Sequence, residues 1–279
     1  MAATTLLYTN LIFHEKLGEG GYGTVRKVTF KEPFMDKTEA AAKTVFQLEP
    51  REIEVLEKVN HPNIVGLFGV IQEGPMTCIV LEYAPKGTVH DYHKANGNNP
   101  TPDELTLKWM TESALALQYL HGINVIHRDL KGPNCLLFED YKLKLSDFGL
   151  ARELFHSVTT SSIKGTYRYM APEIHEDGHY SFASDMWAYG MLMVEIVSGK
   201  EPFHGLEWHV VVYQVTEHGL NPDIPKNCPR DVAQVLHQCW NRNPALRPSS
   251  ASVAVFMSGQ SLFPQQGKSP LLVYCCTHL

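Results

Sequence analysis

At residues 127–134 the chain reads His-Arg-Asp-Leu-Lys-Gly-Pro-Asn, and at residues 147–149 it reads Asp-Phe-Gly. Asp129 can accept a proton from an incoming hydroxyl group, and Lys131 can neutralise a phosphoryl group during its transfer. Each of these residues, taken by itself, would be an ordinary polar residue of a loop. The two segments in this order indicate a site for phosphoryl transfer.

Two side chains of these segments are suited to a divalent cation. Asn134 and Asp147 supply the hard oxygen atoms that magnesium prefers. They stand thirteen residues apart, and Ala-Pro-Glu follows at residues 171–173. The probability that unrelated loop residues occur in this order by chance is negligible. We therefore predict that Asn134 and Asp147 bind Mg²⁺.

Towards the N-terminus, residues 18–25 read Gly-Glu-Gly-Gly-Tyr-Gly-Thr-Val. Glycines allow backbone N–H groups to approach phosphate oxygens closely, but the pattern alone is weak because it also occurs in ordinary turns. A dinucleotide-binding oxidoreductase needs a helix directly after the glycines. Residues 25–30 instead alternate like a half-buried strand. The segment therefore predicts a β-hairpin over phosphates and argues against the oxidoreductase.

Lys43 would be a solvated charge at a strand edge if it were considered alone. Residues 50–59 predict a helix that begins with a proline, which suits a first turn. Glu52 precedes Leu56 and Val59 by four and seven residues, so it shares their inward face. A carboxylate on that face can hold the lysine in place, and we predict an ion pair between Lys43 and Glu52.

The pattern of apolar residues divides the chain into a strand-rich part and a helical part. The predicted strands cover residues 11–13, 25–30, 64–71 and 76–83. Further helices are predicted at residues 105–120, 186–197 and 232–240, and the second of these is apolar enough to be buried. We therefore expect an α+β fold of two lobes, followed by a poorly ordered tail at residues 259–279.

Together these motifs resemble the eukaryotic protein kinases over residues 11–258. The resemblance implies an N-lobe at residues 11–83, a hinge at 82–86 and a C-lobe at 87–258, with Mg-ATP in the cleft between the lobes. It implies that Asp129 is the catalytic base. The residues implied for the nucleotide are Leu17, Gly18, Glu19, Gly20, Gly21, Tyr22, Gly23, Thr24 and Val25 above it, Ala41 and Leu136 around adenine, Lys43 on the phosphates, Leu81 as gatekeeper, and Glu82 and Ala84 in the hinge.

The same resemblance extends to the supporting framework. It implies that Asp185 anchors the backbone of the catalytic loop and that Arg247 pairs with Glu173. The residues that it implies for a stacked apolar spine are Leu56, Leu67, His127 and Phe148. One departure is that the strand before Lys43 is richer in alanine than is usual in the family.

The catalytic loop is similar to that of serine/threonine kinases, because Lys131 lies two residues after Asp129, where tyrosine kinases usually have alanine. Thr166 is predicted to bond Asp129 and Lys131. Residues 205–207, 224–229 and 236–240 further resemble the mixed-lineage MAP kinase kinase kinases, above all the member with a leucine zipper and a sterile-alpha-motif. This resemblance implies protein substrates, with MAP kinase kinases as the candidates.

Composition limits which binding partners and which cellular compartment are to be expected. A net charge of -6 gives no reason to expect nucleic acid or an anionic membrane as the main partner. The six cysteines show no metal-ligand spacing, and we find neither a signal peptide nor a stretch long enough to insert stably in a membrane. A reducing, cytoplasmic setting is the expectation.

The alternative to an active enzyme is a catalytically weak kinase-fold scaffold that acts by binding proteins. The catalytic and ATP residues are all present, which favours the enzyme. Arg128 could pair with a phosphate on the hydroxyl-rich segment after residue 149. We therefore predict activation by phosphorylation at Thr159 or Ser162, by an upstream kinase or in trans by another copy. A hydroxyl-rich loop without a regulatory role is the alternative.

Overall fold

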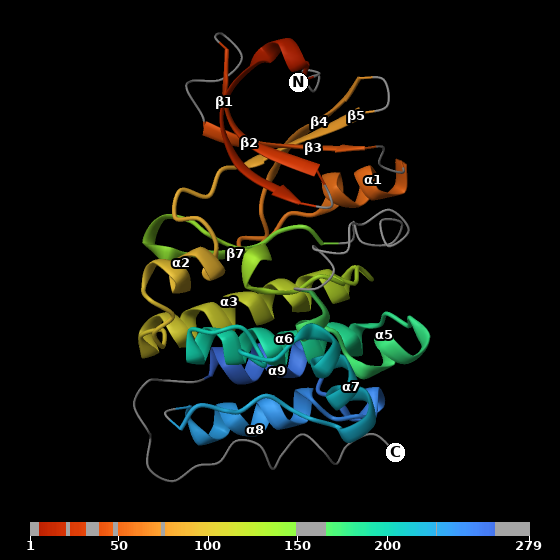
Figure 1. Cartoon of the computed structure of the whole chain (residues 1–279). Helices are drawn as coiled ribbons and strands as arrows, with labels where there is room; N and C mark the ends of the chain where they lie inside the picture. Colours follow the sequence, from red (N-terminus) through yellow and green to blue (C-terminus); the bar gives the residue numbers. More distant parts are fainter. Residues whose placement is uncertain are drawn as a thin grey trace.

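The computed structural model describes residues 6–20, 23–31, 39–46, 50–73, 76–148, 166–226 and 228–259. Most strands gather in one lobe and most helices in the other, which are the upper and lower parts of Figure 1. The last strand of the upper lobe ends at Glu82 and the next helix begins at Val89, so the connection passes through the predicted hinge. The predicted α+β, two-lobed fold is confirmed.

The upper lobe is built on an antiparallel sheet with the strand order β1-β2-β3-β5-β4. Its strands are β1 (Leu11–Gly20), β2 (Gly23–Phe30), β3 (Glu39–Phe46), β4 (Leu67–Glu73) and β5 (Met76–Glu82). Ala40 and Ala42 of β3 are buried in an apolar core with Val28 and Val80. Successive side chains of a strand point to opposite faces, so Ala40 and Ala42 share the face that meets this core. Strand β3 pairs with β2 on one side and with β5 on the other, and the small alanine side chains fit this central position.

The glycine-rich segment forms the predicted hairpin, since Gly18, Glu19 and Gly20 pair with residues of β2. Gly23 has a φ of +126°, and a Cβ atom there would lie 1.9 Å from the Thr44 carbonyl oxygen. Only glycine fits so close to β3 without moving the backbone.

The helix α1 (Pro50–Lys58) lies beside the sheet. Leu56 and Val59 are buried, as the spacing predicted.

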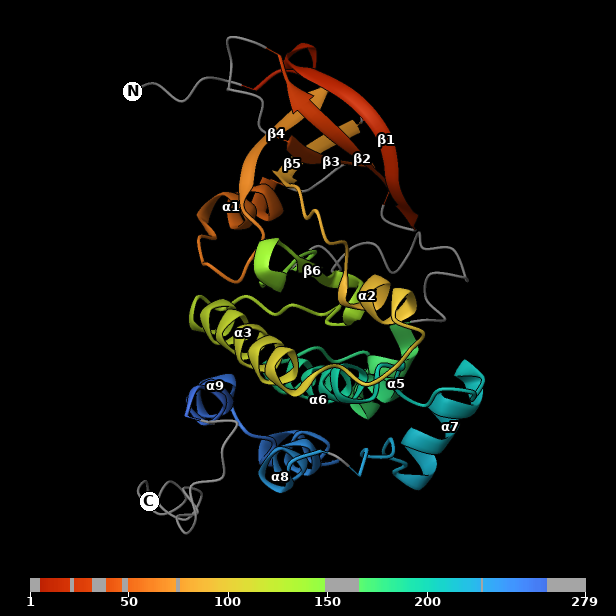
Figure 2. The ribbon, with the colours of Figure 1, turned by 90° about the vertical axis from the view of Figure 1, so that its left-hand side faces the viewer.

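The lower lobe is mainly helical. Its helices are α2 (Val89–Ala95), α3 (Asp103–Gly122), α5 (Pro172–Asp177), α6 (Phe182–Ser198), α7 (Trp208–His218), α8 (Arg230–Cys239) and α9 (Ser250–Ser258). Two short strands, β6 (Cys135–Leu137) and β7 (Leu143–Leu145), pair with each other. Figure 2 shows β6 between the upper sheet and the helices, while α8 lies farthest from the sheet.

The helix α6 forms the centre of this lobe. It begins after Ser181, whose hydroxyl accepts a hydrogen bond from the Ser184 amide, and it ends at Gly199, which is left-handed with a φ of 73°. Its residues from Ser184 to Val197 are all buried, so the predicted central helix is confirmed. No helix in the described part of the chain, α6 included, is both long and apolar enough to cross a membrane.

The two lobes are also joined behind the hinge. The Asn63 amide donates to the Leu143 carbonyl oxygen at 3.0 Å, and the Val65 N–H donates to the Leu145 carbonyl oxygen at 3.0 Å. These bonds explain a correction to the predicted strand at residues 64–71. The segment before Leu67 pairs with β7 of the lower lobe, so β4 begins at Leu67 and not at Ile64.

Several elements escaped the sequence prediction, namely α2, α5, α7, α9 and the β6–β7 pair. The run Val-Val-Val-Tyr within α7 favours a strand by local preference. In the fold, Val211 and Val215 lie one helical turn apart and are both buried. Tertiary burial of that face outweighs the intrinsic preference.

Candidate active site

A cleft of about 440 Å³ opens between the lobes. Its upper wall comes from β1, β2 and β3, its inner end from the hinge, and its lower wall from β6 and the end of β7. The predicted residues that line it are Leu17, Gly18, Val25, Ala41, Lys43, Leu81, Glu82, Ala84, Leu136 and Asp147. Ala41 and Leu136 approach from opposite lobes, which leaves room for a flat ring between them.

Some predicted residues lie elsewhere. Glu19 is exposed, and its carboxylate pairs with Lys16. Gly23 and Thr24 form the hairpin but do not line the cleft. Gly20 ends β1, while Gly21 and Tyr22 lie outside the described residues.

The cleft has further lining residues that the sequence reasoning missed, which are Tyr83, Pro85, Gly87, Thr88, Asp91, Pro133 and Ser146. Thr88 and Asp91 cap α2 reciprocally: the Thr88 hydroxyl accepts from the Asp91 amide at 3.0 Å, and the Asp91 carboxylate accepts from the Thr88 amide at 3.1 Å. A threonine three residues before an acidic residue is a capping signal that could have located this helix start.

The catalytic loop places its charged groups close together. The Lys131 ammonium lies 2.8 Å from Oδ2 of Asp129 and donates to the Thr166 hydroxyl, also at 2.8 Å. The Asn134 amide donates to the backbone oxygen of Asp129 at 2.7 Å and to its Oδ2 at 2.9 Å. Oδ1 of Asp129 is buried and makes no hydrogen bond within the described structure. Oδ1 of Asp129 is therefore available to accept a proton from a bound molecule.

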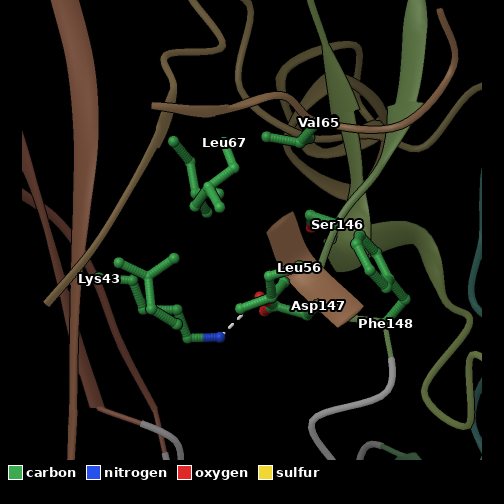
Figure 3. Close-up of a pocket in the computed structure, with 9 residues that line it drawn as sticks. Lys43, Leu56, Val65, Leu67, Ser146, Asp147 and Phe148 are labelled. Carbon is green, nitrogen blue, oxygen red and sulfur yellow. Dashed lines mark hydrogen bonds and ion pairs between the residues drawn. The ribbon is translucent and has the colours of Figure 1, made fainter. Parts of the chain in front are cut away.

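Across the cleft, the Lys43 ammonium lies 2.6 Å from Oδ1 of Asp147 (Figure 3). Burial by itself would raise the pKa of Asp147, but the positive charges of Lys43 and Lys131 lower that pKa below its ordinary value. Asp147 is therefore anionic at neutral pH. The predicted partner Glu52 belongs to α1, but its side chain lies outside what the structure describes, so the Lys43–Glu52 pair stays a prediction.

Behind the cleft is a small apolar hollow, shown in Figure 3. Leu56, Leu67 and Phe148 line it together, and these are members of the predicted spine. Leu81 lines both this hollow and the main cleft, as a gatekeeper would. His127 is fully buried, but it is not among the residues that line the hollow.

The catalytic loop is anchored from α6. The Asp185 carboxylate accepts hydrogen bonds from the backbone amides of His127 at 2.7 Å and Arg128 at 2.9 Å. It also bonds the His121 ring at 2.9 Å. Arg128 and Asp147 both adopt a positive φ, of 71° and 59°, which non-glycine residues hold only where the surroundings enforce it. The predicted anchoring by Asp185 is present.

The predicted pair of Arg247 and Glu173 is also present. The guanidinium donates to the two carboxylate oxygens at 2.6 and 2.7 Å, and it stacks over the Trp187 ring at 5.1 Å. Such a bidentate pair fixes both position and orientation. It ties the segment after Thr166 to the C-terminal part of the lobe.

These residues fit a nucleotide with a divalent cation. The side-chain nitrogen of Asn134 donates to Asp129, so the side-chain oxygen Oδ1 of Asn134 is the atom left for a cation. Asp147 offers a carboxylate oxygen beside the one bound to Lys43. Among the described residues, no group of three or more His, Cys, Asp or Glu side chains is arranged to hold a metal ion by itself. A small number of protein oxygens is what magnesium needs when nucleotide phosphates and water complete its shell.

A two-lobed fold with a lysine-bearing strand above the cleft and this catalytic loop below it defines a protein kinase domain. The chain belongs to the protein tyrosine and serine/threonine kinase family, which it matches over residues 11–257. The predicted enzyme class is thereby confirmed.

Among known proteins, the chain is 34% identical over 264 residues to mitogen-activated protein kinase kinase kinase 11 of Homo sapiens, covering 88% of this chain and 31% of that protein. It is 34% identical over 219 residues to mitogen-activated protein kinase kinase kinase 12 of Rattus norvegicus, covering 78% of this chain and 24% of that relative. The predicted resemblance to MAP kinase kinase kinases is confirmed. The matches span about a quarter to a third of the length of these relatives.

Proposed function

We propose that the chain transfers the γ-phosphoryl group of Mg-ATP to serine or threonine hydroxyls of protein substrates. The observation that supports this most directly is the position of Lys131, 2.8 Å from both the Asp129 carboxylate and the Thr166 hydroxyl. One charge thus faces the candidate base and the segment that a protein substrate would meet. Catalysis of this kind depends mostly on positioning and on charge neutralisation.

Each residue has a definite part in this proposal. Asp129 uses Oδ2 for Lys131 and Asn134, so its buried Oδ1 accepts the proton of the substrate hydroxyl. Lys131 neutralises the phosphoryl group as it moves. Lys43 orients the phosphates, and Asn134 and Asp147 hold the metal. Magnesium, when bound there, would supply positive charge that offsets the negative charge of the phosphate oxygens.

Serine or threonine is proposed as the acceptor because of the Lys131–Thr166 bond. It closes the space beside Asp129 with a short side chain, and a short acceptor hydroxyl therefore reaches the base more readily than the longer tyrosine side chain. We propose residues 11–258 as the catalytic domain and residues 259–279 as a tail outside it.

The names of the relatives suggest a place in signalling. Several are called mitogen-activated protein kinase kinase kinases. We propose that this chain likewise acts on protein kinases of the level below, the MAP kinase kinases, in the cytoplasm. Whole-protein roles of the relatives involve lengths of chain that this match does not cover.

Turnover by the purified protein is the direct test. The chain is incubated with radiolabelled ATP, magnesium and a panel of serine-, threonine- and tyrosine-containing peptides, beside the Asp129→Asn variant. We expect label on serine and threonine peptides, with loss of transfer in the variant. Absence of transfer by the wild-type chain, together with intact nucleotide binding, would contradict the enzyme and favour a binding scaffold.

We also propose control by phosphorylation at Thr159 or Ser162, which lie outside the described residues. Arg128 supports this, because its backbone is fixed by Asp185 directly beside the catalytic base. Phosphatase treatment is compared with a variant in which residues 159–162 are all alanine, and both are expected to lose most activity. Full activity in both would refute the regulatory role of Arg128, whereas loss only after phosphatase treatment would place the phosphate elsewhere.

A further inference from the structure

Arg168 is a largely buried cation in the segment after Thr166, and the roles assigned above do not use it. Its guanidinium donates to the backbone oxygen of Phe203 at 2.8 Å and, through its other terminal nitrogen, to that of Leu206. Both acceptors belong to residues 201–206, which lie between α6 and α7 and are called the 201–206 loop below. A single side chain therefore joins this loop to the segment that a protein substrate would meet.

The backbone of the 201–206 loop has an unusual conformation. Phe203 is buried and has a φ of 55°, which a bulky side chain holds only where the surroundings enforce it. Its backbone oxygen accepts a second hydrogen bond from the Leu206 amide at 3.0 Å. The guanidinium also lies 3.4 Å from the backbone oxygen of Pro202. The planar fork of the arginine thus serves several carbonyl groups of a loop that is held in a strained shape.

The loop also supplies a negative charge that faces the arginine. The Glu201 carboxylate lies 3.8 Å from Nε of Arg168, and the same carboxylate lies 3.8 Å from Nδ1 of His90. The side chain of Arg168 is only 16% exposed, so its charge is largely removed from water. Burial of a guanidinium is costly unless oxygen atoms of the protein replace the water. Here the carbonyl oxygens and the carboxylate of one loop replace it together.

The residue before Arg168 makes a second contact with the same part of the lobe. The ring of Tyr167 stacks on that of Trp208, with 5.1 Å between the ring centroids and 21° between the planes. Trp208 is the first residue of α7, which follows the 201–206 loop. Tyr167 and Arg168 are therefore attached to the loop and to the helix behind it, and these elements form one continuous surface.

We propose that Arg168 is a positioning residue for protein substrates, which keeps the 201–206 loop against the segment after Thr166 and so fixes the surface that receives the substrate polypeptide. This inference rests on the proposed function. Thr166 accepts the bond from Lys131 and stands two residues before Arg168, so a displaced loop would alter where an acceptor hydroxyl arrives. Arg168 is not among the residues that line the nucleotide cleft, so it acts on the polypeptide and not on ATP.

The first test separates the two KM values and kcat in the full-length chain. Arg168→Met keeps an apolar stem and removes the guanidinium, and we expect the KM for a serine/threonine peptide to rise about fivefold or more while the KM for ATP changes little. A mere loss of folded protein would lower kcat and leave both KM values unchanged. Arg242→Met is the matched control, because Arg242 donates to the Thr216 backbone oxygen and to the Glu176 carboxylate, away from the 201–206 loop.

The second test follows the loop itself by hydrogen exchange and mass spectrometry. The Leu206 amide is bonded within the loop, so the fragment that contains it should exchange faster in Arg168→Met than in the wild type. The fragment that covers residues 127–134 should exchange at an unchanged rate. Arg168→Lys keeps the charge without the planar fork, so it should show the same changes to a smaller degree. If Arg168→Met does not fold, Arg168→Lys takes its place in both tests.

The two proposals fail in different ways. A wild-type chain without transfer overturns the proposed function itself. An active wild type combined with an unchanged peptide KM in the folded Arg168 variant overturns only the role of Arg168. Unchanged exchange of the loop would also overturn that role, because other contacts would then hold the loop. An equal rise of the peptide KM in Arg242→Met would overturn it too, because the effect would not depend on this loop.

Discussion

The upper and lower halves of the active site are held in place by different means. Lys43 sits on β3, whose backbone is paired with β2 on one side and with β5 on the other. Below the cleft, residues 127–131 belong to no helix or strand. The amides of His127 and Arg128 donate to the buried Asp185 carboxylate of α6, and the amide of Gly132, directly after this stretch, donates to the buried Glu195 carboxylate of the same helix.

This difference has a physical consequence. A side chain on a paired strand takes its direction from the ladder, so its removal leaves the strand in place. A loop without a ladder depends on the groups that satisfy its amides, and removal of such a group leaves buried donors unpaired. Substitutions in the upper half should therefore affect chemistry alone, whereas substitutions in the lower half should affect chemistry and stability together.

The largest effect on activity is expected for Lys43→Met. Loss of the charge that is proposed to orient the phosphates should reduce phosphoryl transfer by several powers of ten. The unfolding midpoint should fall less than in the lower-half variants below, because the methylene groups of Lys43 are retained and the partner carboxylate of Asp147, 27% exposed, still lies in the field of Lys131. Peptide phosphorylation and calorimetry on the same preparation check this. A large drop in midpoint would break the contrast between the two halves.

Asp185→Ala should lower both the rate of phosphoryl transfer and the free energy of unfolding. It leaves the amides of His127 and Arg128 and the ring of His121 without their shared acceptor. We expect a loss of about 3 kcal/mol in unfolding free energy, together with a loss of transfer. Urea unfolding followed by circular dichroism measures the first. Asp177→Ala, at an exposed acid of the same lobe, is the control, and equal losses in the two variants would contradict the anchoring role.

Ion pairs sharpen the same comparison. Arg247→Met should destabilise the chain by about 3 kcal/mol, because it strands the carboxylate of Glu173 in a largely buried position. Lys27, 19% exposed, pairs with the half-exposed Glu39 at the surface of the upper sheet and lies over the Tyr83 ring. Because solvent reaches this pair more readily, Lys27→Met should move the unfolding midpoint much less than Arg247→Met. Thermal unfolding of both variants in the same buffer gives the answer. Similar shifts of the unfolding midpoint in the two variants would show that burial of an ion pair does not decide how much the pair stabilises the fold.

The smallest effect concerns pH. The folded pKa of Glu195 is about 7, above its ordinary value of 4.5. Between these values the folded chain keeps a proton that the unfolded chain has released, so stability falls as the pH rises through this window and levels off above it. Midpoints measured from pH 5 to 7.5 should therefore decline more steeply for the wild type than for Glu195→Gln. Parallel slopes would contradict the raised pKa.

Local pattern was sufficient for elements whose periodicity agrees with their burial. The apolar run in α6 predicted a buried helix, and the spacing of Leu56 and Val59 predicted the inward face of α1. It failed where burial overrides preference, as in the valines of α7, and where pairing crosses between lobes, as before Leu67. The bonds that set the start of β4 join residues about eighty positions apart, and no local pattern carries that information.

By itself, the sequence determined the kinase fold, and it supplied the candidate catalytic groups and their order along the chain, because each of these depends on residue type and spacing. Only the tertiary structure decided which oxygen of Asp129 is left for a substrate, which cleft residues lie beyond the motifs, and that Glu195 joins Gly132 to Tyr169. The physical reason is that a buried polar group is placed by the partners that satisfy it. Those partners come together only when distant segments have packed.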